Sequence, residues 1–539
     1  MLRSVYNPRR LALSAAMLVI VSGLLGARID KAFSDDNVMA QIEKYNEVLM
    51  MAQKYYVDKV DVSDLNDAAI NGMLSKLDPH SVYMPPKNVK ESAEQFEGKF
   101  EGIGITFTII KDTITVDAPI PGGPSDQLGI MAGDKIVTIE GKPAVGFKNE
   151  DVSKALRGPK GTKVAVGIMR AGQSKPMDFE ITRDIIPIVS VMASFMVDQN
   201  TGYIDVGRFA NSTHDELRAA LEKLSGEGME RLVLDLRGNP GGYLEQAVRI
   251  ADEFIGGNKV IVKTKGRISA FDDVDLSTPG QKYESMPLVV LIDGGSASAS
   301  EIVSGAMQDH DRGLIVGQTS FGKGLVQRQF PLNDGSALRL TISRYFTPSD
   351  RSIQKPYDGN KYAKKGANSL LEDGEDEVDN TEHTREAEDT TRPKYKTMGG
   401  RTVLGGGGVT PDFIVKNDTT QHTTRRMIAA SIIYDYLQSY VGRNAATLKK
   451  QHDAKSYEKS FKITDAMFKE IIDMAKDKKV EFVESEFNID KAWLASVLRA
   501  EIGGRLFGND LRYKILLETD KQFQKAYGLI GEAAKMAKK

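Results

Sequence analysis

The 539-residue sequence contains no cysteine. This absence excludes disulfides, thiolate catalysis and a lipid anchor on an N-terminal cysteine. Histidine is also scarce, because only six residues are scattered along the chain and no His-Glu-x-x-His pattern joins two of them. Without thiolates, a zinc site needs a cluster of histidines and carboxylates. The sequence therefore does not favour a metalloenzyme.

An excess of one charge is lacking as well. The chain has 72 Lys and Arg residues against 74 Asp and Glu residues, which gives a formal net charge of −2. Proteins that bind nucleic acid usually carry a strongly basic stripe, and none stands out here. We therefore do not expect nucleic acid to be the main partner.

The N-terminus has the pattern of an export signal. Arg3, Arg9 and Arg10 precede an uncharged, mainly apolar run over 11–27. A basic stretch followed by an apolar run of this length is typical of a secretory signal peptide or an uncleaved membrane anchor. We expect residues 1–30 to have this role and the rest of the chain to be exported to the periplasm, anchored to the inner membrane if the signal is retained.

The next segments differ in their hydrophobic periodicity. Residues 36–95 are predicted to form a helical N-terminal region, since apolar residues recur there at three- and four-residue intervals. Short alternating runs between glycine and proline turns predict a β-rich domain over 96–184. Residues 185–354 and 403–418 combine continuous apolar runs of strand length with helical patterns, which indicates an α/β core.

Two further segments complete the predicted organisation. Residues 355–402 interrupt the core, and their acidic stretch predicts a solvated, mobile insertion that takes no part in the chemistry. A regulatory or substrate-excluding role is the alternative for this insertion. Residues 419–539 carry amphipathic patterns that predict a helical C-terminal region. For this region, which holds the only tryptophan, Trp493, we expect core packing or contacts between subunits. Both terminal helical regions are candidates for forming a homo-oligomer.

The β-rich segment contains an ordered set of turns that resembles a PDZ domain. The turns include Gly-Ile-Gly-Ile at 102–105 and Pro-Gly-Gly-Pro-Ser at 121–125. The resemblance implies that the first loop binds the terminal carboxylate of a peptide through backbone N–H groups, while the following strand adds the peptide to its edge. The residues of this predicted peptide-binding loop are Gly102, Ile103, Gly104 and Ile105.

A serine-rich block is followed closely by a lysine between two glycines. The block reads Gly-Gly-Ser-Ala-Ser-Ala-Ser-Glu-Ile over 294–302, and the lysine segment reads Thr-Ser-Phe-Gly-Lys-Gly-Leu-Val-Gln over 319–327. A lysine shielded from water can act as the base that activates a serine, because burial lowers the pKa of its amine. From the residues alone, the serines at 296, 298 and 300 are equal candidates for the nucleophile.

These motifs together resemble those of the C-terminal processing peptidases, the carboxyl-terminal or tail-specific proteases of serine peptidase family S41. The resemblance runs from about residue 40 to 415 and includes Asp-Leu-Arg-Gly-Asn-Pro-Gly-Gly at 235–242. It implies a multidomain α+β protein in which a PDZ domain is inserted before an α/β serine protease core of the ClpP/crotonase type, with helical terminal regions. It also implies that Ser298 is the nucleophile, Lys323 the base and Gln327 the residue that positions the base.

Other residues are assigned around this dyad. A helix beginning after the nucleophile would bring the N–H of Ala299 and a positive dipole end to the oxyanion. A second oxyanion donor is expected in the Gly-Gly turn, where Gly241 is favoured slightly over Gly242. The family resemblance further suggests that Arg157 couples peptide occupancy of the PDZ domain to the protease, although a surface salt bridge is the competing interpretation.

Rival catalytic patterns are less complete. The Ser-x-x-Lys sequences at 320–323 and 352–355 lack the companion motifs of penicillin-binding enzymes. A pairing of Ser298 with His310 stays open, although the polar surroundings of that histidine are typical of a solvated helix end. No metal, nucleotide or organic cofactor is implied.

The sequence thus predicts an exported serine endopeptidase that captures free, apolar protein C-termini and cleaves through an acyl-enzyme. The first alternative is a catalytically inactive PDZ scaffold that only binds C-termini. The presence of the serine, the lysine and the glutamine at the expected positions argues against it. The second alternative is an esterase or acyl-transfer enzyme, for which the PDZ-like domain has no evident use.

Overall fold

The computed structural model describes residues 38–170, 172–356, 392–416 and 419–537. These form two compact units, one ending at Tyr83 and one beginning at Met84. The predicted signal segment and most of the predicted acidic insertion lie outside the described residues. No helix among the described residues is long and apolar enough to cross a membrane.

The described residues of the first unit form two helices, α2 (Val38–Tyr55) and α3 (Val62–Leu74). Asp61 begins α3, because its carboxylate accepts a hydrogen bond from the Ser63 N–H at 2.8 Å. Helix α2 buries no residue. Its exposed apolar side chains are Val38, Met39, Ile42, Tyr45, Val48, Met50, Met51 and Tyr55. The helical pattern predicted from the sequence is therefore present, but most of its apolar side chains lack a covering surface within this unit.

The second unit begins with a short helix and a β-rich domain. Its sheet has the order β3-β4-β5-β7-β8 with β6 paired to β5, so β3 is an edge strand, and β2 pairs separately with β9. Buried isoleucine and valine side chains from these strands form its core. The elements are α4 (Pro86–Glu97), β2 (Lys99–Gly102), β3 (Ile105–Ile110), β4 (Thr113–Pro119), α5 (Pro124–Gln127), β5 (Lys135–Ile139), β6 (Lys142–Pro143), α6 (Asn149–Leu156), β7 (Lys163–Met169), β8 (Met177–Thr182) and β9 (Asp184–Pro187). A short strand, β1 (Val82–Met84), precedes α4.

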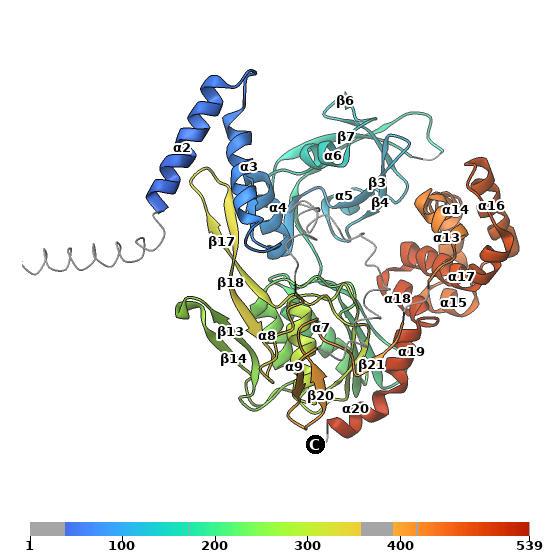
Figure 1. Cartoon of the computed structure of the whole chain (residues 1–539). Coiled ribbons are helices and arrows are strands. Elements are labelled where there is room, and N and C mark those ends of the chain that lie inside the picture. The colour runs from blue at the N-terminus through green and yellow to red at the C-terminus, as the bar shows by residue number, and fades with distance from the viewer. Residues whose placement is uncertain (1–37, 171, 357–391, 417–418, 538–539) are drawn as a thin grey trace, which may run out of the picture. The chain divides into compact units, whose positions relative to one another are not determined.

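A six-stranded sheet forms the centre of the following α/β core (Figure 1). Its order is β10-β11-β12-β15-β16-β21, and every pair except β10 with β11 is parallel. Its strands are β10 (Val191–Met196), β11 (Thr201–Val206), β12 (Arg231–Asp235), β15 (Leu288–Ile292), β16 (Leu314–Gly317) and β21 (Phe413–Ile414). The two apolar runs predicted as buried strands are β12 and β15, which have parallel neighbours on both sides.

Both faces of this sheet are covered. Alternate side chains of the strands pack against α7 (Thr213–Gly226), α8 (Leu244–Asp252) and α9 (Ala299–Asp309) on one face. The side chains between them, such as Val233, Val289 and Leu291, pack on the other face against Phe523, Leu529 and other residues near the C-terminus. A strand with both faces buried must be apolar at nearly every position. This explains why the period-2 alternation is missing from its sequence.

A second sheet in this unit contains strands that are mostly antiparallel. Its order includes β14-β13-β18, and β17 is added on β18. The elements are β13 (Val260–Gly266), η1 (Ser269–Phe271), β14 (Asp273–Leu276), β17 (Leu325–Pro331) and β18 (Ala337–Phe346). A small hairpin of β19 (Lys394–Lys396) and β20 (Thr402–Leu404) follows residues 357–391.

The C-terminal part is helical, as the sequence predicts. The helices are α13 (His422–Ala429), α14 (Ile432–Gln451), α15 (Ala454–Ser460), α16 (Asp465–Asp477), α17 (Glu484–Phe507), α18 (Asn509–Leu517), α19 (Lys521–Gly528) and α20 (Ile530–Met536). The helices from α13 to α18 share one apolar core, whereas α19 and α20 pack on the six-stranded sheet. Trp493 on α17 is 36% exposed, so it is not a core residue of this cluster.

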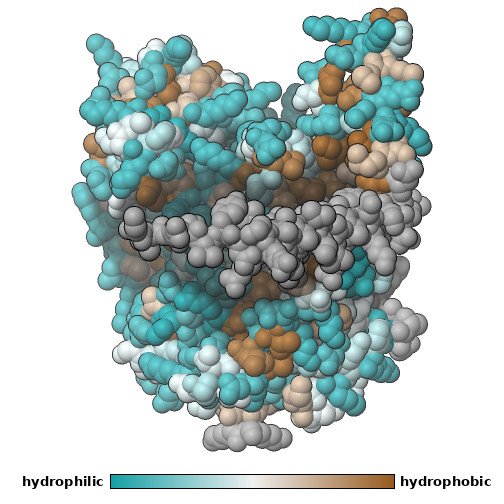
Figure 2. All heavy atoms as spheres, turned by 90° about the vertical axis from the view of Figure 1, so that its left-hand side faces the viewer, coloured by the Kyte–Doolittle hydropathy of each residue, from teal (hydrophilic) through white to brown (hydrophobic). Residues whose placement is uncertain are grey.

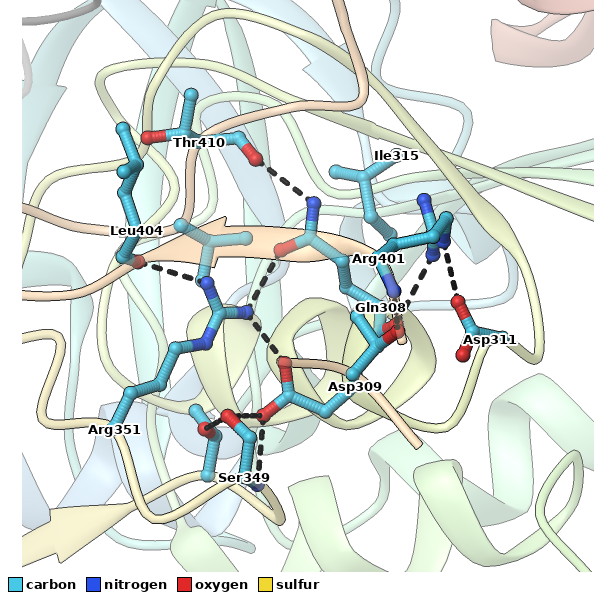
Figure 3. A network of polar contacts seen from close by, with 12 residues as sticks. Gln308, Asp309, Asp311, Ile315, Ser349, Arg351, Arg401, Leu404 and Thr410 are labelled. Carbon is cyan, nitrogen blue, oxygen red and sulfur yellow. Dashed lines mark hydrogen bonds and ion pairs between the residues drawn. The ribbon is translucent and has the colours of Figure 1, made fainter. Parts of the chain in front are cut away.

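A buried polar network fixes the C-terminal end of α9 (Figure 3). Arg351 and Asp309 are both fully buried and form an ion pair of 2.9 Å. Arg351 also donates to Gln308 Oε1 at 2.7 Å and to the carbonyl of Leu404 at 2.9 Å. Arg401 contacts Asp311 from the opposite side of the network. The chain segments that leave the core before residue 357 and return after residue 391 are therefore attached to the same helix end.

The surface seen in Figure 2 is mainly hydrophilic, and apolar side chains gather on it only in small patches. This agrees with the share of charged residues in the chain, which is 27%.

Candidate active site

The serine block forms the turn between β15 and α9. Ser298 directly precedes α9 and has φ 53° and ψ −109°. A non-glycine residue held in such a conformation stores roughly 1–3 kcal/mol of strain and sits on a sharp strand-to-helix turn. Ser298 is partly exposed, whereas Ser296 and Ser300 are fully buried and donate to the carbonyls of Leu236 at 2.7 Å and Asn239 at 2.9 Å. A substrate can therefore reach Ser298 more readily than the two serines beside it.

Glu301 joins the serine turn to the lysine loop. Its Oε2 accepts hydrogen bonds from the N–H groups of Ser298 at 2.8 Å and Lys323 at 2.9 Å. Its Oε1 accepts from Ser320 Oγ at 2.5 Å and from the Gly322 N–H at 2.8 Å. Glu301 is fully buried, which raises the pKa of its carboxyl, while the four hydrogen bonds oppose this shift. The backbone amides of the predicted nucleophile and base thus meet at one carboxylate oxygen.

Tyr345 on β18 makes a second link between the same two residues. Its hydroxyl donates to the carbonyl of Lys323 at 2.5 Å and lies 3.1 Å from the carbonyl of Ser298. Burial raises the pKa of Tyr345 well above its ordinary value, so the hydroxyl keeps its proton and remains a donor. The two residues are therefore clamped side by side at both their N–H and C=O groups.

Hydrogen bonds to residues 352–356 hold the loop that carries Lys323. The Lys355 N–H donates to the Gly322 carbonyl at 2.8 Å, and the Gly324 N–H donates to Gln354 Oε1 at 2.8 Å. The flanking glycines are needed for this approach, because a Cβ on Gly322 would lie 2.9 Å from the Cβ of Lys355. Lys323 itself is partly buried.

Gln327 lies on β17 opposite Thr341, next to a bulge in the pairing with β18. Bulges often redirect a side chain beside an active site. The Nε2 group of Gln327 is buried and has no hydrogen-bond partner among the described residues. Such buried donors are uncommon in folded proteins. Gln327 therefore offers an N–H donor close to the lysine loop.

The glycine-rich loop after β12 lies directly against the serine turn. Gly241 has φ +93°, and a Cβ there would lie 2.7 Å from Ala297 O, 2.8 Å from Ser298 Cβ and 2.9 Å from Ala299 N. Only glycine permits this approach. The Gly241 N–H donates to Asn239 Oδ1 at 2.9 Å, so it must leave this partner to act as the predicted oxyanion donor. Ala299, the other predicted donor, is the first residue of α9.

His310 lies too far from Ser298 to act as its base. The two residues flank the 11-residue helix α9, whose rise of 1.5 Å per residue separates its ends by about 16 Å. The His310 Nε2 is instead 2.6 Å from the carbonyl of Val260, and burial lowers the pKa of the ring. The Ser–His pairing that the sequence leaves open is therefore wrong. Among the described residues, no group of three or more His, Asp or Glu side chains could hold a metal ion.

The predicted peptide-binding loop connects β2 to the edge strand β3. Gly102 ends β2 and Ile105 begins β3, while Gly104 between them has φ +74°. The Ile103 carbonyl accepts hydrogen bonds from the N–H of Ser125 at 3.1 Å and from its Oγ at 2.7 Å. The loop is thus anchored to α5, and it lies at the beginning of an edge strand.

Arg157 follows α6 and contacts α4. Its Nη1 lies 2.5 Å from Glu94 Oε2, and its guanidinium group is 4.7 Å from the centre of the Phe100 ring. The side chain remains 43% exposed. The structure therefore contains a salt bridge at this position, and the coupling role of Arg157 stays a prediction.

Comparisons with known proteins match successive parts of the chain to different families. The model of peptidase family S41 matches residues 200–359, and the PDZ domain model matches residues 93–169. The model of the activating protease CtpB N-terminal domain matches residues 27–88, and a family of unknown function matches residues 423–508.

Named relatives agree with these matches. The carboxy-terminal-processing protease of Bartonella bacilliformis is 39% identical over 350 residues, which cover 64% of this chain and 78% of that protein. The chain belongs to the carboxy-terminal processing proteases of peptidase family S41. CtpB of Bacillus subtilis, a second such protease, is 36% identical over 59% of this chain and 66% of its own length. The solved photosystem II D1 C-terminal processing protease is 29% identical, with a TM-score of 0.33, over 57% of this chain and 89% of that one.

This S41 protease is therefore a serine-type peptidase with a PDZ domain before its protease domain. The predicted residues Ser298, Lys323 and Gln327 fall within the part matched by the S41 model, and Arg157 falls within the part matched by the PDZ model.

Sequence reasoning did not assign a role to Glu301 or Tyr345. A local signal for Glu301 exists, because Ser-x-x-Glu at the start of a helix is the pattern of a capping box. Its contacts to residues 320–323 have no such signal, since they depend on how β16 and the following loop return to α9. Tyr345 has no local signal of this kind, because its hydroxyl contacts appear only in the fold.

Proposed function

We propose that this S41 protease is an exported endopeptidase that cleaves with a Ser298–Lys323 dyad and recognises its substrates by their C-termini. The observation that carries the proposal is the double clamp by Glu301 and Tyr345, which holds the peptide units of the two residues together. Partial exposure and a strained backbone at Ser298 fit a nucleophile, and the partial burial of Lys323 fits a base.

In the acylation step, the neutral amine of Lys323 takes the proton of Ser298 Oγ as this oxygen attacks the scissile carbonyl carbon. The tetrahedral intermediate collapses when Lys323 gives that proton to the leaving amine, which releases the C-terminal fragment. An N–H group can donate to a neutral amine but not to an ammonium group. Gln327, whose Nε2 has no partner among the described residues, is proposed to make this donation.

In the deacylation step, Lys323 takes a proton from water, the resulting hydroxide attacks the ester carbonyl, and the proton returns to Ser298 Oγ. Both tetrahedral intermediates carry a negative oxygen. The N–H of Ala299 at the positive end of α9 is suited to stabilise it, with a second donor from the Gly241–Gly242 turn. Loss of one such donor typically costs about 10²–10³ in kcat.

The PDZ domain provides the substrate-binding site in this proposal. An extended peptide pairs with the free edge of β3, and the backbone N–H groups at 102–105 hold its terminal carboxylate. Only an extended segment can add to a sheet edge, so the substrates are proteins whose C-termini are unstructured. These C-termini are also free, because the loop binds a terminal carboxylate, and we expect them to be apolar. A reporter peptide whose C-terminus is amidated should therefore be cleaved more slowly than the same peptide with a free carboxylate.

Arg157 is proposed to couple this binding to the protease through α4. Glu94, its partner, lies on the same helix as Ser92, whose Oγ accepts a hydrogen bond from Arg339 at 2.7 Å. Arg339 belongs to β18, the strand that pairs with Gln327 and carries Tyr345. If this path operates, Arg157→Ala should change the advantage of a free C-terminus over an amidated one.

Two further parts of the proposal concern location and assembly. The basic and apolar N-terminal sequence supports export to the periplasm, with or without retention of an anchor. The unburied apolar side chains of α2 support a homo-oligomer formed through the helical regions. Fractionation of cells that express the full chain tests the location.

The decisive experiment compares wild type, Ser298→Ala and Lys323→Ala on one unfolded reporter with a free apolar C-terminus. The dyad predicts cleavage by the wild type and a loss of at least about 10³-fold in kcat for each variant. Equal cleavage by wild type and Ser298→Ala would contradict the assignment of the nucleophile. If the wild type binds the reporter without cleaving it, the chain acts as a C-terminus-binding scaffold instead.

A further inference from the structure

The last helices of the chain are part of the protease core rather than an appendage. Helices α19 and α20 cover the face of the six-stranded sheet opposite α7, α8 and α9 (Figure 1). Phe523 is 2% exposed and its ring lies 5.7 Å from that of Tyr203, in an edge-to-face arrangement. This apolar contact places the beginning of α19 beside β11, the strand that pairs with β12, and the glycine-rich loop at 236–242 follows β12.

Polar side chains at the beginning of α19 contact Arg237 in that loop. Arg237 Nη1 is 2.7 Å from Asp520 Oδ2 and donates to Gln522 Oε1 at 3.0 Å. Gln522 is almost fully buried, and its Nε2 donates to the Val415 carbonyl at 2.9 Å, which fixes the direction of its oxygen. Asp520 also accepts a hydrogen bond from the N–H of Phe523 at 3.0 Å and thereby begins α19.

Arg237 uses its remaining donors on Asp235, the last residue of β12. Its Nη2 donates to Asp235 Oδ2 at 2.6 Å and its Nε lies 3.0 Å from each carboxylate oxygen. Tyr203 donates to the same Oδ2 at 2.8 Å. Asp205 is the neighbour of Asp235 on β11, and burial raises its pKa to about 8. At neutral pH Asp205 is therefore mostly uncharged, and Asp235 and Asp520 are the carboxylates in contact with the guanidinium group.

The loop that begins with this cluster ends at the serine turn. The carbonyl of Leu236 accepts from Ser296 Oγ at 2.7 Å, and the carbonyl of Asn239 accepts from the Ala297 N–H at 3.0 Å. A Cβ on Gly241 would lie 2.8 Å from the Ser298 Cβ, so the loop packs directly against the serine turn. A displacement of Arg237 would therefore move the loop that borders Ser298.

We infer that residues 520–536 are a positioning element of the active site, in which Asp520 and Gln522 hold Arg237 and thereby keep the loop at 236–242 against Ser298. The inference rests on the proposed role of Ser298 as the nucleophile. Hydrogen bonds that hold the loop at 236–242 in place keep the oxyanion donors aligned for the transition state. Substrate binding by the PDZ domain does not depend on the position of this loop. Loss of the contact should consequently lower kcat and leave KM nearly unchanged.

The test uses the full-length protease and the substitution Asp520→Asn. Asparagine retains the hydrogen bond that begins α19 but removes the charge facing Arg237. The expected result is a fall in kcat of about 10-fold, with KM within about twofold of wild type. The matched control is Asp510→Asn in α18, because Asp510 accepts from the Ser194 N–H at 2.9 Å and faces Lys223, away from the loop. This control should keep the wild-type kcat.

A double-mutant cycle shows whether Asp520 acts through Arg237. Arg237→Lys keeps the positive charge but loses the fork that spans Asp235 and Asp520. In that background, Asp520→Asn should lower kcat by less than it does in the wild type. Additive effects, a change in KM alone, or a kcat loss equal to that of Asp510→Asn would overturn the inference.

Ser298→Ala separates this inference from the proposed function. If Ser298→Ala retains cleavage, the proposed nucleophile is wrong and the positioning role fails with it. If Ser298→Ala is inactive while Asp520→Asn matches the wild type in kcat, the dyad stands and only the role of the C-terminal helices is refuted. Thermal melting of each variant identifies losses that come from unfolded protein.

Discussion

Glu301 illustrates how a buried charge can organise a site without touching the substrate. All four atoms that contact its carboxylate are hydrogen-bond donors. Two are the backbone N–H groups of Ser298 and Lys323, and the other two are Ser320 Oγ and the Gly322 N–H. A carboxylate has acceptor sites for all four, whereas a carboxamide has one oxygen and a nitrogen that donates. The charge itself is therefore needed to hold the two segments together.

We predict that Glu301→Gln lowers kcat by at least about 10²-fold, because in either orientation its NH2 group would face at least one backbone N–H donor and weaken the clamp. Asp309→Asn, at the other end of α9, is the matched control. Asp309 is equally buried and paired with Arg351, so this variant should lower the melting temperature while the folded fraction keeps its kcat. Steady-state kinetics and thermal melting distinguish the two effects. Similar kcat values for both variants would contradict the clamp.

Asp205 leads to a prediction on the pH dependence of stability. Its pKa is about 8 in the folded protein, mainly because of burial and then because of the charge on Asp235, and about 3.9 in an unfolded chain. A raised folded pKa means that the contribution to stability is complete below about pH 4 and is lost as the pH rises to about 8. The loss is at most about 1.4 kcal/mol per pH unit.

Asp205→Asn removes this dependence. The melting temperature of the variant, relative to that of the wild type, should therefore increase between pH 5 and pH 8 and stay level above pH 8. Melting curves recorded at several pH values measure the difference. Parallel curves for the two proteins would show that Asp205 ionises in the folded state as it does in the unfolded chain.

At the scale of elements, the active site is built where three chain segments meet: the loop after β12, the turn before α9 and the loop before β17. The apolar runs of β12 and β15 predict these strands from sequence, because strands buried on both faces must be apolar throughout. The start of α9 is also predictable from the serine block and the glutamate that follows it. The contacts between segments are not, since Glu301 and Tyr345 meet residues far away in the sequence.

The packing of the loop after β12 against the serine turn depends on Gly241. Gly241→Ala would place a Cβ within 2.9 Å of three atoms of the serine turn and would impose a positive φ on alanine. The turn must shift to relieve the overlap, so we expect a loss of at least about 10²-fold in kcat with the protein still folded. Gly238→Ala, in the same loop, is the control, because it also imposes a positive φ of +64° on alanine but its Cβ meets nothing within 4 Å. Kinetics and circular dichroism together test this prediction, and a fully active Gly241→Ala variant would contradict it.

At the scale of the whole molecule, the sequence predicts helices near both ends but not the surfaces that they cover. The amphipathic pattern over 509–536 indicates helices, yet nothing in it specifies that α19 and α20 pack on the protease sheet. The same pattern in α2 leaves its apolar side chains exposed in its own unit. Helix patterns identify an apolar face, whereas the partner of that face depends on the whole fold.

The exposed face of α2 leads to a prediction on assembly. Ile42→Glu combined with Val48→Glu places two charges on α2, and if the proposed homo-oligomer forms through this helix, the double variant should be a monomer. Glu43→Lys, on the opposite side of the helix, should leave the mass unchanged. Light scattering coupled to size-exclusion chromatography gives the masses. An unchanged mass for the double variant would show that the subunits do not associate through α2.

We have proposed that Ser298 is the nucleophile and that Lys323 activates it. The most direct measurement is mass spectrometry of the protein after reaction with a fluorophosphonate, which forms a stable adduct on an activated serine. The account predicts one adduct on Ser298 in the wild type, no adduct in Ser298→Ala and a strongly reduced labelling rate in Lys323→Ala. An adduct on Ser296 or Ser300, or equal labelling of wild type and Lys323→Ala, would contradict it.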